Sequence, residues 1–134
     1  MAILSAVTSG TQSATSGSFE PIPGLTLPLP EGVGISALVI LNLPNPFAQG
    51  NSNPGGVFGV SVNGTVSPIQ ASFTYNEVNP PSTGRIPTTL VVPVPLTTTK
   101  QIIQGMWQGV PAARSSLTAR RCSARSARSL FRFD

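Results

Sequence analysis

Arg85 closes the run Ser82, Thr83, Gly84, Arg85, and it is the only arginine among the first 110 residues. Its guanidinium donates hydrogen bonds in a planar fork, which suits two adjacent oxygen acceptors better than a lysine ammonium does. The two hydroxyls both donate and accept, and Gly84 permits a turn that lets a ligand approach the backbone. Tyr75 adds a ring and a phenol. These residues predict a binding site.

The scarcity of charge limits what such a site binds. Charged residues are 9% of the chain, whereas an ordinary soluble domain carries about 25%. Up to Val110 the ionisable residues are Glu20, Glu31, Glu77, Arg85 and Lys100. All remaining cations are arginines within residues 111–134, so a nucleic acid or an anionic surface would depend wholly on that segment. We therefore expect the body to bind a ligand without high charge.

Residue types on which many enzyme active sites depend are missing. The chain has no histidine, and Cys122 is its only cysteine, so a Ser-His-Asp triad, a His/Cys metal cluster and an intrachain disulfide cannot be built. The body carboxylates Glu20, Glu31 and Glu77 have no acidic neighbour in the sequence, which disfavours hydrolysis by a pair of carboxylates, although they could still meet in space. We predict neither enzymatic activity nor a cofactor.

Short apolar segments rich in β-branched residues alternate with proline and glycine, which is typical of many strands and few helices. The expected strands are Ile3 to Val7, Ile35 to Leu43, Val57 to Val62, Ala71 to Tyr75, Thr88 to Val94 and Gln101 to Trp107. Asn63-Gly64 is the dipeptide preferred in two-residue hairpin turns. The length suits one all-β domain, an antiparallel sandwich or jelly roll.

Within these strands the period of two assigns faces. Leu90, Val92 and Val94 share one face, and Val91 lies on the other, wetter face. Phe73 and Tyr75 alternate along one strand, and the period alone leaves open which of them is in the core. Trp107 is interpreted as a packing residue at a protomer interface rather than as a platform on which a ligand stacks.

Several strings in a fixed order resemble a known family. They are ALVILNLPNPFAQGN (37–51), PGGVF (54–58), SFTYN (72–76), PPSTGRIPTTLV (80–91) and the Gly-x-Trp of 105–107. Over about residues 18 to 110 the chain is similar to the bacterial tumour-necrosis-factor-like (TNF-like) fucose-binding lectins, which form the amino-terminal domain of a Burkholderia-type superlectin. The resemblance implies a TNF-like jelly-roll sandwich that assembles as a homotrimer and binds fucosylated glycans between neighbouring protomers.

The resemblance also implies which residues contact the sugar. One protomer would contribute Thr74, Tyr75, Ser82, Thr83 and Arg85, and the neighbouring protomer would contribute an apolar wall that includes Phe47. A deoxyhexose offers neutral vicinal hydroxyls and a methyl group, which match a guanidinium fork, small hydroxyls and an aromatic wall. The chain departs from the family pattern at Phe47 and Val57, where tyrosines are expected, and near Gln70, where an acidic residue is expected.

The last segment differs from the body. Residues 1–110 are predicted to form the lectin domain, and residues 111–134 a basic low-complexity tail rich in Ala, Ser and Arg. Where the family has a Val-Arg-Gly-Ser string with a further binding arginine, Val110 is here followed by Pro111. The codon set of the tail permits a shifted reading of the form R-G-S-x-x-I-D-S, so we hypothesise a frameshift near Val110. We accordingly predict a jelly roll that lacks a proper final strand.

Other functions remain open beside glycan binding. The chain could be a structural jelly-roll assembly module without a ligand, in which Arg85 is only a solvated loop residue. Binding of nucleic acid or an anionic surface by the tail is disfavoured, since no aromatic residues are interleaved until Phe131 and Phe133. No apolar run approaches the roughly 20 residues of a membrane span. We expect a soluble protein without a conventional signal peptide, and the sequence leaves open whether it is exported or displayed on a cell surface.

Overall fold

The computed structural model describes residues 3–14, 16–49, 55–74, 87–110, 121–125 and 128–133. Its strands are β1 (Ile3–Val7), β2 (Thr11–Ala14), β3 (Glu20–Leu29), β4 (Ser36–Leu43), β5 (Asn45–Gln49), β6 (Gly55–Val62), β7 (Thr65–Thr74), β8 (Thr88–Pro95), β9 (Gln101–Val110), β10 (Arg121–Arg125) and β11 (Arg128–Phe133). All pairs between them are antiparallel. None of the residues described forms a helix that could cross a membrane.

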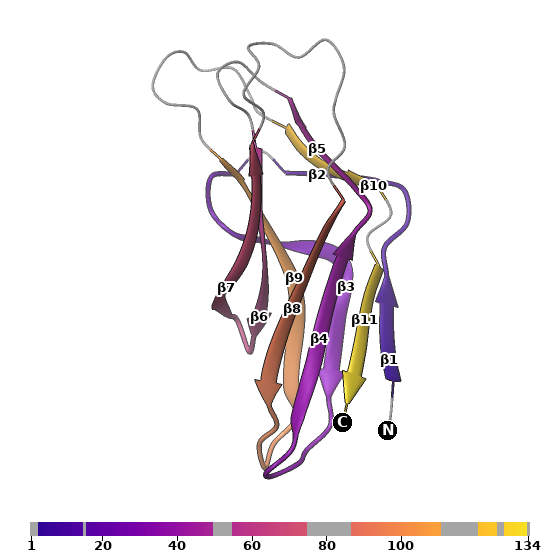
Figure 1. Cartoon of the computed structure of the whole chain (residues 1–134), viewed down its shortest axis with the longest axis vertical. Helices are drawn as coiled ribbons and strands as arrows, with labels where there is room; N and C mark the ends of the chain where they lie inside the picture. The colour runs from indigo at the N-terminus through magenta and orange to yellow at the C-terminus, as the bar shows by residue number, and fades with distance from the viewer. Residues whose placement is uncertain are drawn as a thin grey trace.

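The strands form three sheets (Figure 1). Sheet I has the order β1-β11-β4-β8, sheet II the order β3-β9-β6-β7, and the small sheet III the order β2-β10-β5. Apart from the β6–β7 hairpin, successive long strands alternate between the two large sheets: β3 lies in sheet II, β4 in sheet I, β6 and β7 in sheet II, β8 in sheet I and β9 in sheet II. The predicted all-β jelly-roll sandwich is confirmed.

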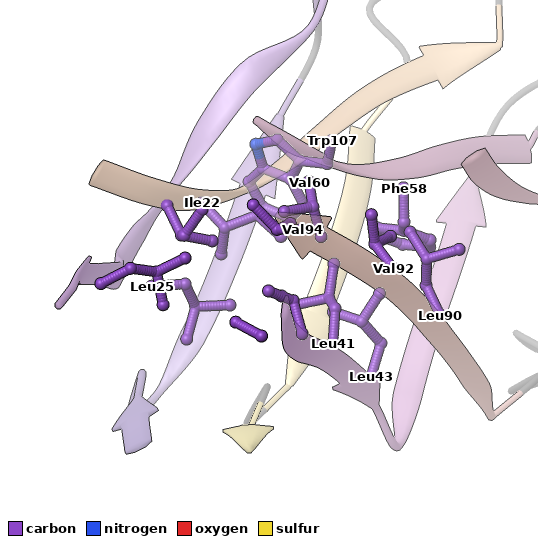
Figure 2. Packing of buried hydrophobic residues seen from close by; sticks show 14 of the residues in the cluster. Ile22, Leu25, Leu41, Leu43, Phe58, Val60, Leu90, Val92, Val94 and Trp107 are labelled. Carbon is purple, nitrogen blue, oxygen red and sulfur yellow. The ribbon is translucent and has the colours of Figure 1, made fainter. Parts of the chain in front are cut away.

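The core fills the space between sheets I and II (Figure 2). Leu90, Val92 and Val94 of β8 are buried, whereas Val91 is 45% exposed, so the predicted alternation is confirmed. Phe73 is buried and stacks on Phe58 with ring centroids 5.9 Å apart. Tyr75 lies outside the described residues. In β4 and β8, alternate residues therefore supply the core, as period two requires.

Trp107 belongs to the core as well. It is 2% exposed, lies opposite Phe58 in the register between β9 and β6, and is one of the largest fully buried side chains. Figure 2 shows its indole among the side chains between the sheets. The interpretation of Trp107 as a residue of a protomer interface is therefore wrong, because its side chain is buried in the core of its own protomer.

All six predicted strands are present; β7 begins six residues before the predicted Ala71, and the other described ends lie within three residues of the predicted ones. The longest strand that the sequence failed to predict is β3, which contains Pro21, Pro23 and Pro28. The direction of the backbone hydrogen bonds explains how this strand accommodates a proline at position 28. Ile102 donates its N–H to Asn63 Oδ1 at 2.8 Å and accepts from Asn63 N–H at 2.8 Å, so its backbone groups point to the β6 side and away from Pro28 opposite it. The N–H that Pro28 lacks would therefore point to the unpaired side of β3 at the edge of the sheet. Proline is tolerated at such a position.

The hairpin predicted at Asn63-Gly64 is confirmed, since these residues join β6 to β7 with φ angles of 50° and 84°. Both values lie in the left-handed region that a type I′ turn requires. Asn63 also accepts the hydrogen bond from Ile102 through its side chain, so the turn is fastened to β9. The turn residue thus has both a conformational and a bonding role.

The prediction that the jelly roll lacks a proper final strand is wrong. β11 lies between β1 and β4, and β10 lies between β2 and β5. In the β11 register Ser129, Phe131 and Phe133 are opposite Leu41, Val39 and Ala37 of β4, all of which are buried. Phe131, Arg132 and Phe133 alternate between apolar and charged with period two, a signal that the prediction of a low-complexity tail did not use. The division of the chain at residue 110 and the frameshift stay predictions.

Substitution of Asn63 tests the two roles of the turn separately. We expect Asn63→Ala to lower the free energy of unfolding by about 2–3 kcal/mol, because it combines a left-handed φ costing about 1–2 kcal/mol with a lost hydrogen bond worth about 1 kcal/mol. Asn63→Gly keeps the conformation and should lose only about 1 kcal/mol. Urea unfolding of both variants measures this, and equal losses would contradict the assignment.

Removal of residues 111–134 tests whether the tail is part of the sandwich. Without β11, β4 keeps β8 as its only neighbour and β1 loses its partner in sheet I. Unpaired backbone groups and uncovered apolar residues favour aggregation. We expect the truncated chain to melt at a lower temperature and to scatter light at micromolar concentration, as followed by circular dichroism and light scattering. A truncated chain as stable and monodisperse as the full chain would refute a structural role for β11.

Candidate functional site

The residues predicted to contact a ligand fall in and around the connection between β7 and β8. Tyr75, Ser82, Thr83 and Arg85 lie outside the described residues. Thr74 is the last residue of β7, where its backbone is opposite Gly55 of β6, and its side chain is outside the described set. The assignment of these residues to a sugar site therefore stays a prediction, and the strands on either side define where it would lie.

The two ends of the connection belong to different sheets. Thr74 ends β7 in sheet II, and Thr88 begins β8 in sheet I, opposite Leu43 at the end of β4. The end of β7 and the start of β8 therefore lie in different layers at one end of the sandwich, the upper end in Figure 1. Four of the six candidate residues lie in this connection, and Thr74 directly precedes it.

Phe47 belongs to the same end of the molecule. It lies in β5, which begins two residues after Leu43 and therefore continues from the end of β4 that is opposite Thr88. In sheet III the backbone of Phe47 is opposite Ser123 of β10. The fold thus brings β5 and the flanks of the connection to one end of the sandwich, although Phe47 is far from them in sequence.

The start of β8 is held by a polar pair. Thr89 donates its hydroxyl to Asn42 Oδ1 at 3.1 Å, directly across from it in the register between β8 and β4. A cross-strand pair of this kind contributes roughly 0.2–1 kcal/mol. It fixes the strand that follows Arg85 by a few residues, so the connection ends on a defined support.

Two further positions where the chain departs from the family pattern lie close together on sheet II. Val57 of β6 is opposite Ser72 of β7, and Gln70 is opposite Gly59 in the next row of the same face. Val57 is half-buried, and Gln70 is exposed with its side-chain amide donating to the Ser67 carbonyl at 3.3 Å. This face carries a small aliphatic group and an amide where the resemblance implies an aromatic ring and an acid.

The acidic residues of the described chain do not form a catalytic pair. Glu20 begins β3, and Glu31 follows its far end, so the strand separates them. Glu77 lies outside the described residues. Among the residues that the structure places, no group of three His, Cys, Asp or Glu side chains could hold a metal ion.

One feature near the connection was missed by the sequence reasoning: an apolar outer face on sheet I. Leu38 and Ile40 of β4 are half-buried, and Pro93 and Val91 of β8 are directly opposite them and exposed. We call these four residues the outer apolar face. The run Ala37 to Leu41 could have indicated it, because a strand that is apolar on both faces is covered on both faces.

Comparison with known proteins identifies the family of this chain. The family model described as the Bc2l-C N-terminal domain matches residues 8–123, which is most of the chain. A search of curated proteins found no match. The match covers the strands on both sides of the candidate connection and the connection itself, and the family is a lectin family rather than an enzyme family. The chain therefore belongs to the family of the Bc2l-C N-terminal domain, a lectin-type domain.

Proposed function

We propose that the protein is a lectin that binds fucosylated glycans between the protomers of a homotrimer. The observation that carries the proposal is the family match, which includes the Ser82–Arg85 run. A guanidinium and two hydroxyls can bind vicinal sugar hydroxyls without requiring charge on the ligand. The proposed contacts are Thr74, Tyr75, Ser82, Thr83 and Arg85 of one protomer and Phe47 of the next.

The position of the outer apolar face supports assembly of several copies. The connection that contains Arg85 leads directly into β8, and β8 contributes Val91 and Pro93 to that face. If another copy covers the face, the connection lies at the edge of the contact between protomers. A sugar there can touch both, as the proposed site requires. This arrangement explains why an aliphatic pair such as Ile40 and Val91 is on the outside of a sheet.

Energetics favour several sites over one. A monosaccharide of about eleven heavy atoms at roughly 0.3 kcal/mol per atom gains about 3 kcal/mol, which corresponds to millimolar binding or weaker. Several sites on one rigid assembly raise the avidity for a decorated surface by about 100-fold or more when the spacing fits. A trimer with shallow sites between protomers therefore suits recognition of a glycan-covered surface.

The first test is substitution of Arg85. Loss of hydrogen bonds from a charged donor costs about 1.5–3 kcal/mol, so Arg85→Ala should weaken fucoside binding by about 10- to 100-fold, and Arg85→Lys should restore little of it. Lys100→Ala is the matched control, because Lys100 is an exposed cation in the connection that follows β8 at the opposite end of the sandwich. Glycan arrays and calorimetric titration with methyl fucoside measure the effect.

The outcomes separate the alternatives. A purely structural module would bind no glycan even as the unmodified protein. A protein that acts through its basic tail would bind nucleic acid, lose that affinity steeply with added salt, and be indifferent to Arg85→Ala. Fucoside binding that survives Arg85→Ala unchanged would remove Arg85 from the site.

The second test concerns the outer apolar face. Val91→Lys places a charge on the face opposite Ile40, and desolvating that charge in a contact is unfavourable. We expect the trimer to dissociate into monomers and the apparent affinity for a fucosylated surface to fall with it, as measured by sedimentation velocity and surface binding. Ile102→Lys, which changes a residue of similar exposure on sheet II, should leave the trimer intact. An intact Val91→Lys trimer would place the protomer contact elsewhere.

A further inference from the structure

The two large sheets have four edge strands, and three of them carry devices that oppose pairing with another chain. β8 contains Pro93 and Pro95, and β3 contains Pro21 and Pro28. β7 contains Pro68 within a stretch where the register with β6 shifts. Proline removes a backbone donor, and a bulge twists an edge away from a flat partner.

The hydrogen bonds at β8 show that its prolines block the free side. Leu96 donates its N–H to the Ile35 carbonyl at 2.9 Å, which makes these two residues a hydrogen-bonded pair between β8 and β4. In an antiparallel ladder such pairs alternate with pairs whose backbone groups point outward. Pro95 and Pro93, opposite Ser36 and Leu38, take the outward positions. Two of the outward donors of this edge are therefore absent.

β1 is the fourth edge and has none of these devices. Its sequence, ILSAV, contains no proline, glycine or charge. The same alternation, followed through the registers of β4 with β11 and of β11 with β1, directs the backbone groups of Ile3, Ser5 and Val7 to the free side. Ile3 and Val7 are each 56% exposed, while Leu4 packs against the core. Within the described part of the chain no strand pairs with this side of β1, which presents outward backbone groups and apolar side chains.

The sequence of β1 fits a second copy of itself. When two β1 strands run antiparallel with Ser5 opposite Ser5, Ile3 of each copy is opposite Val7 of the other. Directly opposite aliphatic residues stabilise a strand pair, and a small residue at the axis avoids a clash. A twofold contact requires this reciprocity, in which one residue meets a second and the second meets the first.

We propose that β1 pairs antiparallel with β1 of a second copy across a twofold axis at Ser5, so that two copies of the four-stranded sheet I become one continuous sheet. The pairing goes beyond the proposed function, since it needs neither Arg85 nor a glycan. Applied to the proposed trimer, with the twofold axes perpendicular to the threefold axis, it joins two trimers into a closed assembly and doubles the number of sites. Applied to single protomers, it gives a dimer.

The pairing predicts a change in mass on modification of the edge. Ser5→Pro removes only an outward donor, and Val7→Lys adds a charge at the edge, so each should halve the mass of the assembly by light scattering coupled to size exclusion. Ile69→Lys is the matched control, because Ile69 is an exposed aliphatic residue on the edge strand β7, which already carries Pro68. The control should keep the full mass. Unchanged masses for both edge variants would overturn the proposal.

Cross-linking provides a second readout that does not depend on stability. A hydrogen-bonded pair at the axis places the two Cα atoms of residue 5 about 5.5 Å apart. Ser5→Cys in a Cys122→Ser background leaves one thiol, and a short bifunctional thiol reagent should give a covalent dimer in high yield. Ile69→Cys in the same background should stay uncross-linked. Equal yields for both would overturn the pairing.

Fucoside titration of the same edge variants keeps this proposal distinct from the lectin proposal. Halved mass with unchanged affinity for methyl fucoside supports the pairing and is independent of the sugar site. A full-mass assembly in the edge variants refutes the pairing, whether or not fucoside binds. Absence of fucoside binding from every protein refutes the lectin proposal alone.

Discussion

The antiparallel register between β4 and β8 is the constraint on which most of this structure depends. The hydrogen bond from Leu96 to Ile35 fixes which residues of the two strands exchange backbone bonds. In this register Leu90, Val92 and Val94 lie in the core and Val91 lies outside it. A slip of one residue would exchange these two sets, burying prolines and exposing the core, so one register is strongly specified.

The same register connects folding to the candidate function. Because β8 begins opposite the end of β4, the connection that contains Arg85 enters sheet I beside the outer apolar face. The core on one face of β8 gives that entry a rigid support, and a support of this kind suits a site formed by a loop. The proposed binding residues precede β8, the proposed protomer contact includes its outward residues, and its inward residues belong to the core. Its core residues provide stability, and its outward residues are available for assembly.

Proline placement unites the fold with its assembly properties. The abundance of proline in this chain argues against long helices and, on first reading, against long strands. In the structure several prolines occupy outward positions at sheet edges, where the missing donor costs no internal hydrogen bond and discourages unwanted pairing. β1 differs from the other edges of the large sheets in this respect, and that difference is the physical basis for expecting a specific partner there.

The sequence by itself determined the fold class, six of the strands, the Asn63-Gly64 hairpin and the buried face of β8. These depend on period two and on local conformational preference, which act between neighbouring residues. The sequence did not predict β3 or β11. A proline-rich segment can form a strand when its prolines face an unpaired edge of the sheet. The basic segment of β11 forms a strand because it pairs with both β1 and β4. The sequence also misjudged Trp107, whose burial depends on the opposite sheet. Only the tertiary structure decided the positions of β3, β11 and Trp107. It also decided that the edge strand β1 lacks proline and that the outer face of sheet I is apolar. All of these depend on the register between segments that are distant in the chain.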